Sequence, residues 1–571
     1  MATESQTGTT RVRASLTWLD LALIVVLFCA SVSVFARYTH GDLWLDEADY
    51  AVAGTHSTHD NRWDRSDKPD QPELLIRLRH YHAPATALIL QLAHRFGSDD
   101  ETLRFPFVLA GAASVIMIYL CGCALFGPRR EIAFACALLT ILTPANIRMA
   151  SHAVPWSFII LELLILLYTT LQLTRTRNGL WLIAIGMGMG LLFVTSETFF
   201  VVCAVLAIVL PLTLLPEIVE QLRRRGIIKP AEAQREPAKL MSRGSLVKGT
   251  AGAVLAFLAV AVAFWPAGLK GHCITMLRHY IEMRHSESFA VNIGNQVYKI
   301  APKWSYLYWY FFDYRPFFLC YAVGFIVLLL VAILQFRTVL EVPASQPDNV
   351  SSTKSEGIAD WVRLPTGSYA LLLFTLVLLA AAHRAHIIGP EYLAHCLPFL
   401  ALCAGCVVQL ISRRSISVGF VVLLVAGGVF LRWRPSRALP GMEPRTQISR
   451  WKPTATAIAA RWQPLDRILL GPQSPNVAYW YLHEWAHIPM HDWQVGQFTL
   501  SGPGPNFLRN IANGKYRYIV VSSQFEDNVI NAVDKRTMQL LQGSHWETFM
   551  RSDEHRMGPS RLTVFRYRDL P

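Results

Sequence analysis

The chain has 571 residues, of which 53% are hydrophobic and only 16% charged, and its net charge is +13. That composition is too apolar for an ordinary water-soluble enzyme of this length. The basic residues are divided among many short segments, whereas a nucleic-acid-binding surface gathers them on one face. We therefore expect an integral membrane protein with no nucleic-acid partner.

The apolar residues occur in continuous blocks, and about 20 residues of helix cross the ~30 Å hydrocarbon core of a bilayer. We predict about eleven transmembrane helices, two of which rest on weaker blocks that keep the chain alternating between the two sides. The first block follows Arg11 and Arg13 as a signal peptide would, but it lacks a small-residue cleavage site, so we expect it to be retained. The clear blocks are 16–36, 104–126, 155–173, 197–215, 249–269, 317–336, 368–382, 393–411 and 417–431, and the weaker ones are 132–144 and 180–195.

The basic residues also predict the orientation, because cytoplasmic loops are enriched in Lys and Arg. With the N-terminus in the cytoplasm, the inside segments hold 19 such residues, and the short outside loops hold only Arg148 and Arg384. We expect a multi-pass protein of the cell (inner) membrane with an extracytoplasmic C-terminus. The inside residues are Arg11, Arg13, Arg129, Arg130, Arg175, Arg177, Arg223, Arg224, Arg225, Lys229, Arg235, Lys239, Arg243, Lys248, Arg337, Lys354, Arg363, Arg413 and Arg414.

The composition changes at residue 432, where Gly, Pro, Asn and charged residues return. Strand-like runs then alternate with helical stretches, which is typical of an α/β domain. We predict a transmembrane domain at 1–431 and a small soluble extracytoplasmic α/β domain at 432–571, acting as a lid or a docking module. The strand-like runs are 467–470, 516–522 and 562–567, and the helical stretches are 454–462, 475–485 and 526–541.

Asp46 and Glu47 follow the first predicted span closely and are flanked by hydrophobic residues. This position predicts a carboxylate pair at the outer membrane surface. Partial desolvation there makes the pKa of a carboxylate tunable, as a general base requires. The alternative is an acidic pair that stabilises a helix N-terminus through the helix dipole.

An ordered set of short motifs accompanies this pair. They are WLDE at 44–47, HYHAP at 80–84, RFP at 104–106 and the segment from Pro144 to Trp156. In this order and spacing the chain resembles the GT-C membrane glycosyltransferases. The nearest branch contains the protein O-mannosyltransferases, the lipid A aminoarabinose transferases and the rhizobial galacturonosyltransferases.

The resemblance covers residues 16–215, with a second, weaker motif match at 389–398, and it is not complete. His152 stands where the family has Glu, Val154 where it has Arg, and Trp156 where it has Tyr. If the acid at this position holds a metal in relatives, His152 retains a ligand atom but loses the carboxylate. An interfacial histidine with satisfied hydrogen bonds is the alternative.

The resemblance implies an α-helical polytopic fold and an inverting transfer of sugar from a polyprenyl-phosphate donor. The acceptor would be a lipid, a polysaccharide or a protein on the outer face, within reach of membrane lipids. Asp46 would be the base, and Glu47 would orient it or bind donor or metal. No cofactor is certain, although a divalent metal fits the family. Residues for substrate or metal are His80, His82 and His152, and those for the donor phosphate are Lys270, Arg278, Arg284, Arg384 and Arg148.

Two other classes of protein stay open. A transporter or flippase would show inverted repeats and ionisable residues at the membrane midplane. Here the predicted spans hold few ionisable residues, with Glu162 the main exception. A degenerate GT-C scaffold is favoured slightly by His152 and Val154, whereas the intact Asp46 and Glu47 argue against it.

The charge asymmetry makes a direct prediction about topology. A reporter enzyme that is active only in the cytoplasm should be inactive when fused after Pro571 and active when fused after Arg414. Activity after Pro571 would mean that the number of spans is wrong, with 132–144 and 180–195 the first to doubt.

Overall fold

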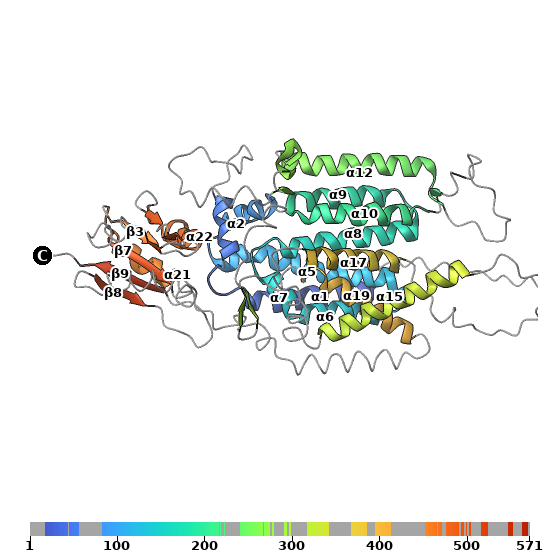
Figure 1. The fold of residues 1–571 in the computed structure, drawn as a ribbon, viewed down its shortest axis with the longest axis horizontal. Coiled ribbons are helices and arrows are strands. Elements are labelled where there is room, and N and C mark those ends of the chain that lie inside the picture. Colours follow the sequence, from blue (N-terminus) through green and yellow to red (C-terminus); the bar gives the residue numbers. More distant parts are fainter. Residues whose placement is uncertain are drawn as a thin grey trace, which may run out of the picture.

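A bundle of apolar helices makes up most of the protein, and a small mixed sheet lies at one end of it (Figure 1). The structure is a computed structural model. It describes residues 17–43, 45–55, 83–215, 217–218, 222, 240–266, 268–274, 277–278, 291–293, 296–298, 317–341, 367–384, 394–412, 451–464, 466–470, 475–489, 493–495, 498–499, 502–503, 516–522, 546–551 and 562–568.

The predicted apolar blocks are helices wherever they fall within these residues, which confirms the α-helical polytopic fold class. Four helices are long and apolar enough to cross a membrane by themselves, and a bent pair makes a fifth candidate. The last predicted block, 417–431, lies outside the described residues, so the number eleven stays a prediction. The helices are α1 (Trp18–Phe35), α5 (Asp100–Phe126), α6 (Arg130–Leu142), α8 (Trp156–Thr176), α9 (Leu180–Thr195), α10 (Thr198–Thr213), α12 (Arg243–Phe264), α15 (Phe317–Glu341), α17 (Ser368–Arg384) and α19 (Leu397–Ser412).

The segment that we placed between the third and fourth spans is not a simple loop. It contains the short helix α7 (Pro144–Ser151), which meets α6 at an angle of 70°. Thr143 is extended and Pro144 occupies the first turn of α7. A proline there fits because the first turn has no hydrogen-bond partner for its N–H groups. The bend brings the end of α7 toward the start of α8.

Asp20 joins three helices at the end of the bundle that we predict to be cytoplasmic. It forms a capping box with Thr17 at the start of α1. The same carboxylate accepts a hydrogen bond from the Tyr119 hydroxyl on α5 at 2.6 Å and pairs with Arg130 on α6 at 3.0 Å. Because Asp20 is fully buried, these partners offset the cost of removing its charge from water.

Small residues let α9 and α12 pack closely. A Cβ atom at Gly186 would lie 2.1 Å from the carbonyl oxygen of Ala253, and one at Gly249 would lie 2.6 Å from that of Gly179. Lipid tails are as apolar as the helix surface, so the hydrophobic effect does not drive helices together in a bilayer. Close van der Waals packing of the backbones drives their association instead. The glycines therefore explain why α12 stays attached at the edge of the bundle (Figure 1).

The C-terminal region contains a five-stranded sheet of order β4-β3-β7-β9-β8. β3 is parallel to β4 and β7, while β9 is antiparallel to β7 and β8. The three predicted strand regions are confirmed as β3, β7 and β9, and the short β4 and the bulged β8 were missed. The strands are β3 (Ile468–Leu470), β4 (Trp493–Val495), β7 (Tyr518–Ser522), β8 (Trp546–Arg551) and β9 (Leu562–Tyr567), and the accompanying helices are α21 (Trp451–Ala459), α22 (Pro475–Tyr479) and η6 (Trp480–Trp485).

The remaining elements are short and lie mainly in segments that we predict to be outside. Two of them, α2 and α4, connect the bundle to the C-terminal sheet (Figure 1). The remaining elements are η1 (Ala36–Tyr38), α2 (Leu45–Thr55), α4 (Ala85–His94), η3 (Gly268–His272), and the two antiparallel pairs β1 (Val291–Ile293) with β2 (Gln296–Tyr298) and β5 (Phe498–Thr499) with β6 (Gly502–Pro503).

One hydrophobic core runs from α2 and α4 into the C-terminal domain. It includes Val52 and Leu90 on the bundle side and Trp480 and Ile458 on the domain side, all fully buried. Residues just after the first span therefore lie at the same end of the bundle as residues after the last span. An even number of membrane crossings must therefore separate these two regions. We count each described apolar helix from α5 to α19 as one crossing, with α6 and α7 taken together. Adding the predicted span 417–431 then gives an even number.

The glycine packing predicts a contrast between two identical substitutions. Gly186→Ala should lower the free energy of unfolding by about 1–3 kcal/mol, because the new methyl group meets the backbone of Ala253. Gly244→Ala, in the first turn of α12, meets nothing within 4 Å and should be neutral or stabilising by up to about 1 kcal/mol. Unfolding of the purified proteins in detergent measures both, and equal effects would contradict the close α9–α12 contact.

Candidate active site

The predicted carboxylate pair lies in the first turn of α2, just outside the end of the bundle. The backbone of Asp46 belongs to the helix, whereas its side chain lies outside the described residues. The side chain of Glu47 is fully buried. A buried carboxylate needs partners that compensate its charge, and their identity decides what Glu47 can do.

Arg104, on the first turns of α5, is the main partner of Glu47. Its Nε and one Nη donate to the two carboxylate oxygens at 2.8 and 2.7 Å. The remaining N–H groups donate to the backbone carbonyls of Thr39, Gly41 and Asp42 at 2.6–2.9 Å. These are five hydrogen bonds for the five N–H donors of a guanidinium, so the buried arginine is fully satisfied.

The carboxylate also reaches the loop between α7 and α8. The backbone N–H of Ala153 donates to Oε1 of Glu47 at 2.6 Å. Segment 39–42, α2, α5 and this loop therefore meet at a single ion pair. Breaking a buried pair of this kind typically costs about 3–5 kcal/mol, because one charge is left uncompensated.

His152 lies next to the ion pair. Burial, together with the positive charges of Arg104 and Arg148, lowers its pKa to about 4, against the opposing effect of Glu47. The ring is therefore neutral at neutral pH. Its Nδ1 lies 2.9 Å from the carbonyl oxygen of Arg148, and a carbonyl only accepts, so Nδ1 carries the proton and Nε2 keeps its lone pair.

The other predicted site residues are not all brought to this place. Arg148 is half-buried on α7, whereas Lys270 and Arg278 are exposed and follow α12, at the other edge of the bundle from α6 (Figure 1). Arg384 ends α17 with its side chain outside the described residues. Arg284, His80 and His82 lie wholly outside them.

The sequence does not decide whether the site holds a metal ion. Among the described residues, no group of three or more His, Cys, Asp or Glu side chains is placed to hold an ion. Both oxygens of Glu47 accept hydrogen bonds from Arg104 or Ala153, so this carboxylate fits a positioning role better than that of a ligand.

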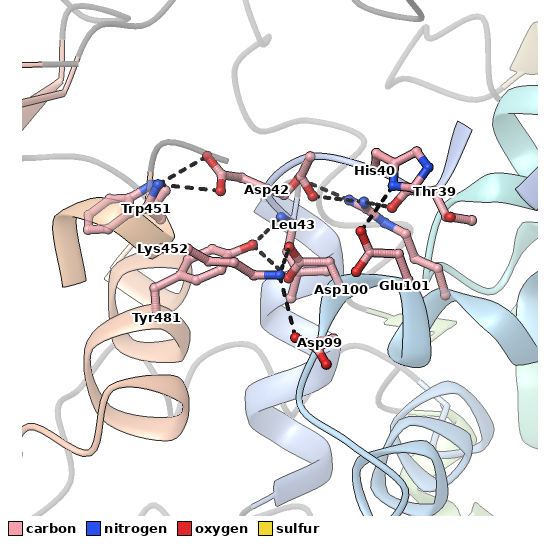
Figure 2. A network of polar contacts seen from close by, with 12 residues as sticks. Thr39, His40, Asp42, Leu43, Asp99, Asp100, Glu101, Trp451, Lys452 and Tyr481 are labelled. Carbon is pink, nitrogen blue, oxygen red and sulfur yellow. Dashed lines mark hydrogen bonds and ion pairs between the residues drawn. The ribbon is translucent and has the colours of Figure 1, made fainter. Parts of the chain in front are cut away.

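A second polar cluster, absent from the sequence predictions, joins the C-terminal domain to the same segment (Figure 2). The hydroxyl of Tyr481 accepts from the backbone N–H of Leu43 at 2.7 Å and donates to Asp100 at 2.9 Å. Lys452 pairs with the other oxygen of Asp100 at 2.9 Å. The carboxylate of Asp42 accepts from the backbone N–H of Trp451 at 3.3 and 3.4 Å.

Comparison with known proteins assigns the fold. The profile of the family described as dolichyl-phosphate-mannose-protein mannosyltransferase matches residues 81–225. The crystal structure of ArnT from Cupriavidus metallidurans bound to undecaprenyl phosphate is 14% identical, with a TM-score of 0.51, and the match covers 96% of this chain and 97% of ArnT. The apo state of that protein gives 13% identity and a TM-score of 0.53 over the same shares.

An archaeal protein has a similar fold. The Archaeoglobus fulgidus oligosaccharyltransferase in its apo form is 12% identical, with a TM-score of 0.51, over 89% of this chain and 70% of the other. No curated protein sequence matches significantly. The chain therefore has the GT-C fold of membrane glycosyltransferases, and the resemblance drawn from its motifs is confirmed.

The geometry of Arg104 predicts that lysine cannot replace it. Lysine keeps the charge but offers three donors at one atom, so it cannot serve both the carboxylate and three backbone carbonyls. Arg104→Lys should lower the free energy of unfolding by about 2–4 kcal/mol. Arg95→Lys, at an exposed position after α4, is the matched control and should change it by less than about 0.5 kcal/mol. Denaturant unfolding in detergent compares them, and equal stability of the two variants would contradict the assigned role.

Proposed function

We propose that this protein is an inverting glycosyltransferase that moves a sugar from a polyprenyl-phosphate donor to an acceptor on the outer face of the membrane. The fold supports the class of reaction, and the ArnT structure holds undecaprenyl phosphate, a lipid of the class that would carry the sugar in the proposed donor. The acceptor is a lipid, a polysaccharide or a protein that presents a hydroxyl group to the site.

One observation carries this proposal: the Glu47–Arg104 ion pair fixes the first turn of α2, where Asp46 lies. Glu47 is the next residue along the helix, and its carboxylate is held by three hydrogen bonds. The backbone of Asp46 is therefore anchored at the end of the bundle. A base held in place by a rigid neighbour loses little entropy on reaching the reacting geometry.

The reaction follows from these roles. The carboxylate of Asp46 takes the proton from the acceptor hydroxyl, and an electron pair of the acceptor oxygen forms a bond to the anomeric carbon. The bond between that carbon and the phosphate oxygen breaks, and its electron pair leaves with the polyprenyl phosphate. Attack from the side opposite the phosphate inverts the configuration. Glu47 positions the base, because its oxygens are engaged by Arg104 and Ala153.

The departing phosphate needs fixed positive charge. Arg104 is the guanidinium that pairs with Glu47, but its five donors are already used by the protein. We assign the phosphate to Arg148, which lies beside His152. Lys270, Arg278, Arg284 and Arg384 stay predictions from the sequence for the same role.

The test is the substitution Asp46→Asn, which keeps the size of the side chain but removes the proton acceptor. Transfer should fall by about 10²–10⁴-fold. The substrates are undecaprenyl-phosphate sugars carrying mannose, galacturonic acid or aminoarabinose, and the acceptors are envelope extracts from cells that lack the protein. Release of undecaprenyl phosphate measures the rate.

Asp49→Asn is the matched control, since it makes the same change three residues along α2. It should retain the parental rate and melting temperature. A folded Asp46→Asn protein with parental activity would remove Asp46 from the mechanism. A wild-type protein that transfers none of the sugars would instead favour a transporter or a degenerate scaffold.

A further inference from the structure

Segment 39–43 leads directly into the catalytic turn, since only residues 44 and 45 separate Leu43 from Asp46. Two parts of the protein hold it. Arg104 of the bundle binds the carbonyl oxygens of Thr39, Gly41 and Asp42. The C-terminal domain binds polar groups of this segment that Arg104 does not contact, which are the N–H of Leu43 and the carboxylate of Asp42.

Tyr481 is the centre of the second attachment. Its ring is fully buried and stacks on Trp451, with 6.2 Å between the ring centroids. Its hydroxyl both accepts, from Leu43, and donates, to Asp100. Burial and the nearby carboxylates of Asp42 and Asp100 raise the pKa of Tyr481 well above its ordinary value, so the hydroxyl keeps the proton that it donates.

Asp100 and Lys452 link Tyr481 to α5 and to α21 (Figure 2). Asp100 stands at the start of α5, one turn before Arg104, and its second oxygen pairs with Lys452 of α21. Because Tyr481 and Asp100 are buried, water does not readily replace a partner that either side chain loses, and a broken bond there leaves an unsatisfied group. The attachment is therefore specific in geometry as well as favourable in energy.

We infer that the C-terminal domain positions the catalytic turn and that Tyr481 is its positioning residue, acting through the backbone N–H of Leu43 on Asp46. This inference rests on the proposed role of Asp46. It assigns the domain a direct part in turnover, in addition to the lid or docking role considered from the sequence. Tyr481 itself touches neither donor nor acceptor in this scheme.

The experiment compares two variants that make the same chemical change. Tyr481→Phe removes the hydroxyl but keeps the ring that stacks on Trp451. Tyr518→Phe is the control: its ring stacks on Trp462 at 6.0 Å, and its hydroxyl donates only within the domain, to the carbonyl oxygen of Arg461 at 3.2 Å. Both variants lose one hydroxyl of the same domain, so a merely structural role predicts similar results for the two.

Two readouts are measured on the full-length protein in detergent. The first is hydrogen–deuterium exchange of peptides covering residues 39–46, which needs no substrate. Tyr481→Phe should speed exchange there roughly five- to tenfold, and Tyr518→Phe should not. The second is steady-state transfer from whichever of the three undecaprenyl-phosphate sugars the wild type uses. Tyr481→Phe should lower kcat roughly ten- to hundredfold, with the KM for the donor unchanged.

Lys452→Met is measured in parallel, in case Tyr481→Phe does not accumulate. It breaks the pair with Asp100 and should change both readouts in the same direction. Unchanged exchange at 39–46, or a kcat equal to that of Tyr518→Phe, would overturn the positioning role.

The same data separate this inference from the proposed function. If Asp46→Asn keeps parental activity, the assignment of the base fails, whatever the exchange results. If Asp46→Asn is inactive while Tyr481→Phe behaves like Tyr518→Phe, the positioning role alone fails. In the Asp46→Asn background, Tyr481→Phe should cause no further loss of rate, because it acts through the base.

Discussion

The pairing of Arg104 with Glu47 is the interaction on which the arrangement of this site depends. A guanidinium enclosed in protein is tolerated only when its charge and all its N–H groups have partners. Arg104 meets this condition by gathering a carboxylate from α2 and three carbonyls from one loop. The requirement of one side chain thus dictates the path of the chain between the first helix and the second.

The C-terminal domain uses the groups that this pairing leaves over. The loop that presents its carbonyls to Arg104 presents an N–H and a carboxylate on its other side, and Tyr481 and Trp451 bind these. The shared apolar core beneath them supplies most of the adhesion, while the polar contacts fix the register. Bundle and domain therefore form a continuous structure around a short stretch of backbone.

Sequence reasoning succeeded where the signal was local. Hydrophobic blocks gave the helices, including the short helix at 180–195, and alternating strand-like runs gave β3, β7 and β9. The motif at 104–106 was found, but Arg104 received no role, although a charged residue near the start of an apolar span calls for a buried partner. Tyr481, Lys452 and Asp100 carried no signal at all, because their contacts join segments hundreds of residues apart. The bend between α6 and α7 was missed because Pro144 reads equally well as the end of a span.

The hydrogen bond from Leu43 to Tyr481 spans 438 residues of sequence, and this has a consequence for biogenesis. Contacts between distant segments form late, since the loop between them must close first. Leu43 is synthesised 438 residues before Tyr481, so the first outside segment exists long before its partner does. In the scheme proposed above, a chain still being inserted lacks the last support of its catalytic turn. Activity would then begin only after residues 451–481 have been made and have reached the same side of the membrane as segment 39–43.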